Sequence, residues 1–123
     1  MAKKILMVPP VNFAVNYVIN PWMEGNMDTV DPVRAAQQWN EVRNFLIEVG
    51  ADVIVMPEPP VNCPDAVFAA NAGLIFKEIF IPSRFKFAER QVEEEYFEDY
   101  FDARDFELRT YETDPATKGM QPP

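Results

Sequence analysis

A carboxylate and an amide lie six residues apart near the middle of the chain, in a stretch that is otherwise almost entirely apolar. They belong to Asp65 and Asn71, and each costs several kcal/mol of free energy when it leaves water without a polar partner. Small residues flank Asn71, so backbone or a ligand can approach it closely. Composition leaves two interpretations open. Either the pair satisfies a turn and a strand edge, or it faces a cationic or zwitterionic ligand.

The irregular segment 9–30 is a second candidate, because loops of this length are uncommon unless they are functional. It contains several asparagines, among them Asn16 and Asn20, and the aromatic residue Trp22. Asparagine favours turns, and spacing alone favours that structural role here. The other interpretation is a lid or rim whose amides and indole contact a polar small molecule.

Cations gather just before or within the first turn of an acidic helix, where they are unfavourable unless an anion is close. Arg84 and Arg90 are the notable ones. The pattern favours compensation within the helix by Glu89 and Glu93. The alternative is a forked contact from either arginine to a substrate carboxylate. The acidic run over 93–102 is predicted to be a solvated helix face.

Composition limits the chemistry further. The 123 residues, 48% of them hydrophobic, suit one domain with a substantial core. A net charge of −9 argues against nucleic acid as a partner. The sequence has no histidine, so this chain alone cannot assemble a Ser-His or Cys-His pair or a usual histidine-containing zinc site. Its one cysteine, Cys63, lies in a proline-rich loop and is predicted to be an unreactive thiol.

The hydrophobic pattern of the sequence predicts neither a membrane span nor a signal peptide. No apolar run reaches the roughly 20 residues that span a bilayer, so no membrane partner is expected. The apolar run at the N-terminus is too short for a signal peptide and meets Pro9 and Pro10 at once. We therefore expect a cytoplasmic protein.

The hydrophobic pattern predicts an α/β fold with two similar units, each of strands plus one helix. Asp31 and Pro32 form a helix start, and Gly50 a helix stop. We expect one domain over 1–112 and a polar, proline-containing, poorly ordered tail over 113–123. The predicted elements are a strand at 3–8, a helix at 32–49, a strand at 52–56, a hairpin at 74–76 and 79–82, a helix at 88–103 and a strand at 106–111.

Four short segments carry a family resemblance, and they occur in the family's order: 15–23, 38–39, 64–74 and 89–91. On these segments the chain resembles the N-terminal half of the pentein superfamily of guanidine-modifying enzymes. The arginine dihydrolases and dimethylarginine dimethylaminohydrolases are the nearest branch, with the amidinotransferases beside them. The resemblance extends over nearly all of 4–108.

The resemblance implies a five-bladed α/β propeller around a central polar site, of which this chain supplies about two blades as a partial propeller. In the family a cysteine attacks the guanidinium carbon, a histidine acts as acid and base, and no metal or organic cofactor is used. At matching positions, Asn71 is implied to be catalytic at the central site. Asn20 is implied to contact the amino-acid end of the substrate and Arg90 its α-carboxylate. Asp65 and Phe68 are implied to line the substrate site.

The departures limit this expectation. The family's later acidic motif, histidine and cysteine have no match in the sequence, Cys63 does not correspond to the nucleophile, and Ala69 and Val92 replace the usual Thr and Gly. The resemblance therefore implies the substrate-binding half of a guanidino-group hydrolase or amidinotransferase-like protein. It would act on arginine or a related compound and be inactive without a complementing chain. The alternative is a non-catalytic module that binds an arginine-like ligand or another protein. Because a partial propeller leaves strand edges and apolar surface open, the expected partners are a second polypeptide supplying His and Cys, or further copies of the chain.

Overall fold

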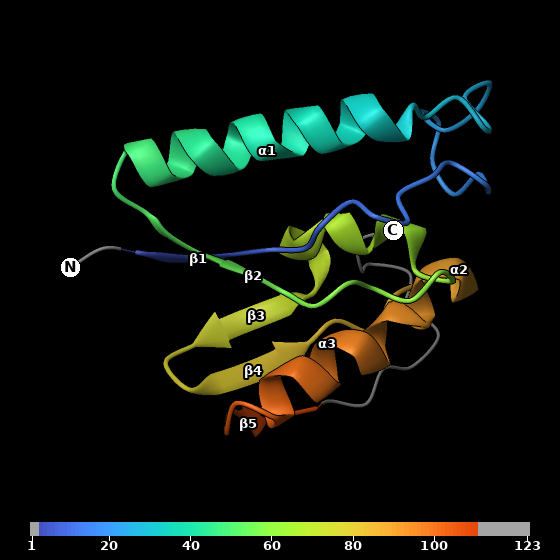
Figure 1. The fold of residues 1–123 in the computed structure, drawn as a ribbon. Coiled ribbons are helices and arrows are strands. Elements are labelled where there is room, and N and C mark those ends of the chain that lie inside the picture. The colour runs from blue at the N-terminus through green and yellow to red at the C-terminus, as the bar shows by residue number, and fades with distance from the viewer. Residues whose placement is uncertain (1–2, 111–123) are drawn as a thin grey trace.

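Two α/β units make up the protein, and the computed structural model describes residues 3–110 of the 123. In Figure 1, α1 lies on one side of β1 and β2, and the β3–β4 hairpin with α3 lies on the other side. The first unit consists of β1 (Lys4–Met7), α1 (Pro32–Glu48) and β2 (Asp52–Val55). The second consists of β3 (Gly73–Phe76), β4 (Ile79–Pro82), α2 (Ala88–Gln91), α3 (Glu93–Asp102) and β5 (Glu107–Leu108).

The first unit is a strand–helix–strand crossover. β1 and β2 pair in parallel from Lys4 opposite Asp52 onward, and α1 packs against β2. The Asp31 carboxylate accepts hydrogen bonds from the backbone N–H groups of Val33 and Arg34, which caps the first turn. Gly50 adopts φ +98° just after the helix, a conformation that favours glycine. The predicted helix is confirmed at both ends.

The second unit is a three-stranded sheet in the order β3-β4-β5. β3 and β4 form the predicted antiparallel hairpin, and β4 pairs in parallel with the short β5. The helix predicted over 88–103 is divided in two at Val92. The last strand is shorter than predicted. The tail at 113–123 lies outside the described residues, so the division of the chain into 1–112 and a tail stays a prediction.

Aromatic side chains from β4 and α3 form the centre of the core. The rings of Phe80 and Phe101 stack with centroids 4.0 Å apart, and Phe97 is 1% exposed. Val8 and Met56, which follow β1 and β2, join the same cluster and so tie the first unit to the second. Within residues 3–110, no helix has the length and apolar character needed to cross a lipid bilayer.

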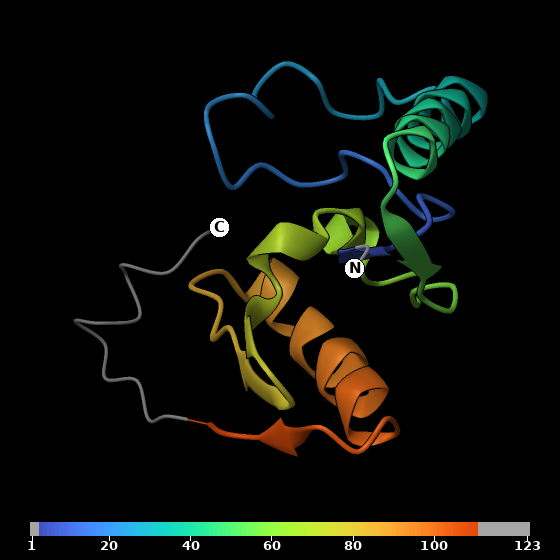
Figure 2. The same ribbon diagram turned by 90° about the vertical axis from the view of Figure 1, so that its left-hand side faces the viewer.

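α1 is less covered by other elements than α3 is, since α3 has buried residues and α1 has none. Its apolar residues Trp39 and Leu46 are only half-buried, and none of its residues is buried. Figure 2 views this helix nearly end-on and shows it far from α3. The described residues therefore place only the β1–β2 layer beside α1. Its large exposed hydrophobic side chains are Val33, Val42, Phe45 and Ile47.

Replacing Phe97 with alanine should lower the free energy of unfolding by about 3–5 kcal/mol, because a buried ring is lost and a cavity remains. Phe45, which is 62% exposed, is the matched control. Its replacement by alanine should change the free energy of unfolding by less than about 0.5 kcal/mol. Urea-induced unfolding followed by circular dichroism measures both variants, and equal losses would contradict this placement of the core.

Candidate functional site

A small cavity of about 220 Å³ lies between segment 9–30 and the turns that precede β3. All five residues that the family resemblance assigned to a site line it, so the structure brings together positions that lie up to seventy residues apart. Ile19 and Met23 complete the wall. The five are Asn20, Asp65, Phe68, Asn71 and Arg90.

Two consecutive 3₁₀ turns set the spacing of three of these residues. η1 spans Pro64–Val67 and η2 spans Ala69–Asn71. The backbone N–H of Phe68 donates to Asp65 O at 3.0 Å, and that of Asn71 donates to Phe68 O at 3.1 Å. Side chains three residues apart eclipse one another in 3₁₀ geometry. Phe68 joins the two turns with φ −82° and ψ 61°, and Asp65, Phe68 and Asn71 all line the cavity. Their spacing of three was present in the sequence but not used in the predictions above.

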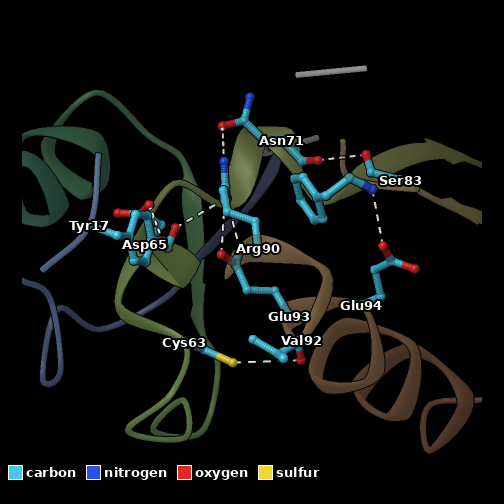
Figure 3. Close-up of polar contacts among 10 residues, drawn as sticks. Tyr17, Cys63, Asp65, Asn71, Ser83, Arg90, Val92, Glu93 and Glu94 are labelled. Atoms are coloured by element: carbon cyan, nitrogen blue, oxygen red, sulfur yellow. Dashed lines mark hydrogen bonds and ion pairs between the residues drawn. The ribbon is translucent and has the colours of Figure 1, made fainter. Parts of the chain in front are cut away.

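Arg90 is the cation of the site, and it is only 3% exposed. Its Nε and Nη2 donate to the two carboxylate oxygens of Glu93, each at 2.8 Å. Its Nη1 donates to Asn71 Oδ1 at 3.0 Å, and Nη2 also donates to the backbone oxygen of Asp65 at 3.2 Å. The guanidinium lies 4.5 Å from the centre of the Phe85 ring. Figure 3 shows this guanidinium between Asn71, Asp65 and Glu93. Of the pairing that the charge pattern favoured, the part between Arg90 and Glu93 is thus present.

The acidic face of α3 departs from its prediction at one position. Glu93 is fully buried, so the expectation that the whole run 93–102 is solvated was wrong there. The physical reason is its partner, because a buried carboxylate is tolerated when a cation pairs with both of its oxygens. Burial raises the pKa of Glu93, and the hydrogen bond and charge of Arg90 offset part of that rise. Farther along α3, Glu94 and Glu98 are half-buried and pair with Arg84.

Asp65 is the anion of the site and is 1% exposed. The hydroxyl of Tyr17 donates a hydrogen bond to its Oδ2, whereas its buried Oδ1 has no hydrogen-bond partner among residues 3–110. Burial raises the pKa of Asp65, and the Tyr17 hydrogen bond and the Arg90 charge lower it in part. Burial and the neighbouring Asp65 both raise the pKa of Tyr17, so this hydroxyl remains a donor. Sequence reasoning had not singled out Tyr17, although it stands inside the matched segment 15–23.

Asn20 combines the two roles left open for the loop. Its Oδ1 accepts a hydrogen bond from the backbone N–H of Met23 at 3.1 Å, which is turn chemistry, and the residue also lines the cavity. Trp22 does not line this cavity and is 81% exposed. A rim made by Trp22 is therefore not supported.

Cys63 is buried away from the cavity. Its thiol donates weakly to the backbone oxygen of Val92 at 3.7 Å, and burial raises its pKa to about 11. These surroundings suit an unreactive thiol, because nucleophilic cysteines need a lowered pKa. Among the residues that the structure describes, no three His, Cys, Asp or Glu side chains are grouped to hold a metal ion. Independence from metals and organic cofactors stays a prediction.

No family model matches the chain, but individual proteins do. The bifunctional arginine dihydrolase/ornithine cyclodeaminase ArgZ of Synechocystis is 43% identical over 103 residues, which are 84% of this chain and 14% of that protein. The dimethylarginine dimethylaminohydrolase of Mycobacterium tuberculosis is 39% identical over 88 residues, 72% of this chain and 28% of that enzyme. The chain thus spans less than a third of the length of these two relatives.

Solved structures agree with these relatives. The N-terminal domain of ArgZ, bound to product, superposes with a TM-score of 0.86 at 41% identity, covering 93% of this chain and 41% of that one. A dimethylarginine dimethylaminohydrolase adduct superposes at 0.73 with 22% identity, covers 92% of this chain and 43% of that one, and supports the fold alone. These matches identify the chain as the counterpart of the N-terminal half of pentein-superfamily guanidine-modifying enzymes. The resemblance read from the motifs and the α/β class are confirmed.

Replacing Tyr17 with phenylalanine should raise the pKa of Asp65 further, because the carboxylate loses its hydroxyl donor. It should also lower the free energy of unfolding by about 1–3 kcal/mol. The side-chain carboxyl resonance of Asp65, followed by NMR through a pH titration, measures the first effect. Tyr96, whose hydroxyl donates to Pro57 O, is the control. An Asp65 pKa that responds equally to Tyr96→Phe, or not at all to Tyr17→Phe, would refute the contact.

Proposed function

We propose that the chain is the substrate-binding half of a guanidino-group hydrolase that acts on arginine or a related compound. The observation that carries the proposal is the convergence of Asn20, Asp65, Phe68, Asn71 and Arg90 on one small cavity. Such a set supplies an anion, a cation, two amides and an aromatic ring, which are the groups a zwitterionic guanidino compound requires.

Each residue has a chemical role in this proposal. The Asp65 carboxylate attracts a positively charged end of the ligand, and Arg90 attracts its α-carboxylate. Asn20 bonds the amino-acid end, and the Phe68 ring covers the aliphatic chain. Asn71 assists the reaction at the central carbon. Support comes from relatives whose structures contain related ligands: a cysteine variant of AgrE with L-arginine, and AgrE with ornithine and NAD⁺.

The histidine and the nucleophilic cysteine come from outside these 123 residues in our proposal, since the sequence holds no histidine and Cys63 is buried away from the cavity. The two α/β units stand for two of the five blades of a propeller, and the domain takes in residues 1–112. A volume of about 220 Å³ is below the roughly 300–1,000 Å³ usual for ligand pockets, as suits a site that another part completes.

Open apolar surface supports the same proposal. A cavity of about 340 Å³ opens between the two sheets, bordered by β1 and β3 and lined mainly by small and hydrophobic residues. The side chains of Leu74, Ile75 and Phe76 on β3 are at least half exposed, at 62%, 50% and 61%. Together with the exposed apolar side chains of α1, these surfaces fit a second polypeptide that continues the fold, or other copies of this chain.

Complementation tests the proposal directly. The chain, combined with a separately expressed C-terminal half of a pentein dihydrolase that carries the histidine and cysteine, should form a complex and hydrolyse arginine with ammonia release. Asn71→Ala in that complex should reduce kcat by about 100-fold or more. Asn62→Ala, at an exposed position outside the 220 Å³ cavity, is the matched control and should retain the rate. A stable complex with neither turnover nor arginine binding would exclude the hydrolase.

One observation favours a second function, that of a non-catalytic ligand-binding module. The contacts described above that hold Asp65 and Arg90 all lie within this chain, so the cavity wall does not depend on another polypeptide for its shape. The isolated chain should then bind arginine, ornithine or agmatine in calorimetry, and Asp65→Asn should weaken that binding at least tenfold. The absence of heat with all these ligands would exclude the module.

A further inference from the structure

Glu93 is the one fully buried carboxylate at the site that does not line the cavity. Both of its oxygens accept hydrogen bonds from Arg90, one from Nε and one from Nη2. Such a two-point contact between a carboxylate and a guanidinium fixes the plane of the guanidinium as well as its position. A single contact would leave the group free to rotate.

The two partners stand three residues apart across the break at Val92, Arg90 in α2 and Glu93 as the first residue of α3. A negative charge in the first turn of a helix is favoured by the helix dipole, which helps Glu93 remain an ionised partner at its buried position. The pairing uses the edge of Arg90 formed by Nε and Nη2, and it directs Nη1 toward the cavity side. There Nη1 donates to Asn71 Oδ1 at 3.0 Å.

We propose that Glu93 is a positioning residue for substrate recognition: it sets the guanidinium plane of Arg90 and, through Nη1, the orientation of the Asn71 amide in the cavity. Glu93 itself touches no ligand. The recognition role of Arg90 rests on the proposed function above, whereas the hold of Glu93 on Arg90 and Asn71 is a property of the fold alone. The two can therefore fail separately.

A merely structural ion pair predicts a different outcome. If Glu93 only stabilised the fold, its replacement would weaken every ligand to the same degree. A positioning role acts through Arg90, so it affects ligands that carry a carboxylate more than ligands that lack one. Arginine and agmatine form a suitable pair of probes, because agmatine is arginine without its carboxylate.

The test uses Glu93→Gln in the full chain, with the complementing half added where the wild type needs it for binding. Calorimetry should show arginine weakened at least tenfold and agmatine less than threefold, and Glu93→Asp, which keeps the charge but shortens the reach, should lie between. Glu94→Gln is the control, because it removes an ion-pair partner of Arg84 on the same helix and should leave the ratio of the two affinities unchanged. Equal weakening of both ligands by Glu93→Gln would overturn the proposal.

A second measurement needs no ligand. It tests the positioning role even where the wild type binds neither compound or where the Glu93→Gln variant folds poorly. In ¹⁵N NMR spectra the Nε–H resonance of Arg90 and the side-chain amide pair of Asn71 should be sharp and shifted in the wild type. Both should move toward the positions of exposed groups in Glu93→Asp. Unchanged Arg90 and Asn71 resonances in that variant would refute the positioning role. Absent ligand binding with these shifts intact would refute only the proposed function.

Discussion

The candidate site depends on one buried cation. The Arg90 guanidinium is almost inaccessible to water, and a charge in that position is tolerated only when other groups replace its hydration. Glu93 supplies the opposite charge, Asn71 Oδ1 and the backbone oxygen of Asp65 accept further hydrogen bonds, and the Phe85 ring lies against the guanidinium. These partners come from α3, from both 3₁₀ turns and from the segment before α2. One side chain therefore contacts each of these elements.

The charge balance around this cation leaves one carboxylate without an opposite charge of its own. Two buried carboxylates, Asp65 and Glu93, surround a single guanidinium. Glu93 is engaged with Arg90 through both oxygens, whereas Asp65 retains an oxygen with no hydrogen-bond partner in the described part of the chain. Burial raises the pKa of Asp65, and a cation brought to that carboxylate would oppose the rise. A ligand with a positively charged end therefore suits this wall better than a simple anion.

Some of this could be predicted from the sequence and some could not, and the difference is physical. α1 and the β3–β4 hairpin depend on local signals, such as the Asp31 cap, Gly50 and the short turn at 77–78, and they were predicted closely. The site residues on 64–71 were ambiguous by composition, and the family resemblance singled them out. The structure then placed them on one cavity. Glu93 was misjudged because it stands in an acidic run typical of a solvated helix face. The local pattern indicated its pairing with Arg90, three residues earlier, but its burial depends on the tertiary packing around that pair.

The polar lining of the cavity is held in place by contacts within this chain. The contacts that shape it, from Tyr17 to Asp65 and from Arg90 to Glu93 and Asn71, join segments of this one chain. Exposed apolar side chains occur on α1 and β3, and others, such as Val18, Phe68 and Val92, lie beside those contacts. A partner that covered α1 and β3 would not need to reorganise these polar contacts, so ordering the wall would cost it little free energy. The polar wall is thus formed within the described residues, whereas the sequence contains no histidine.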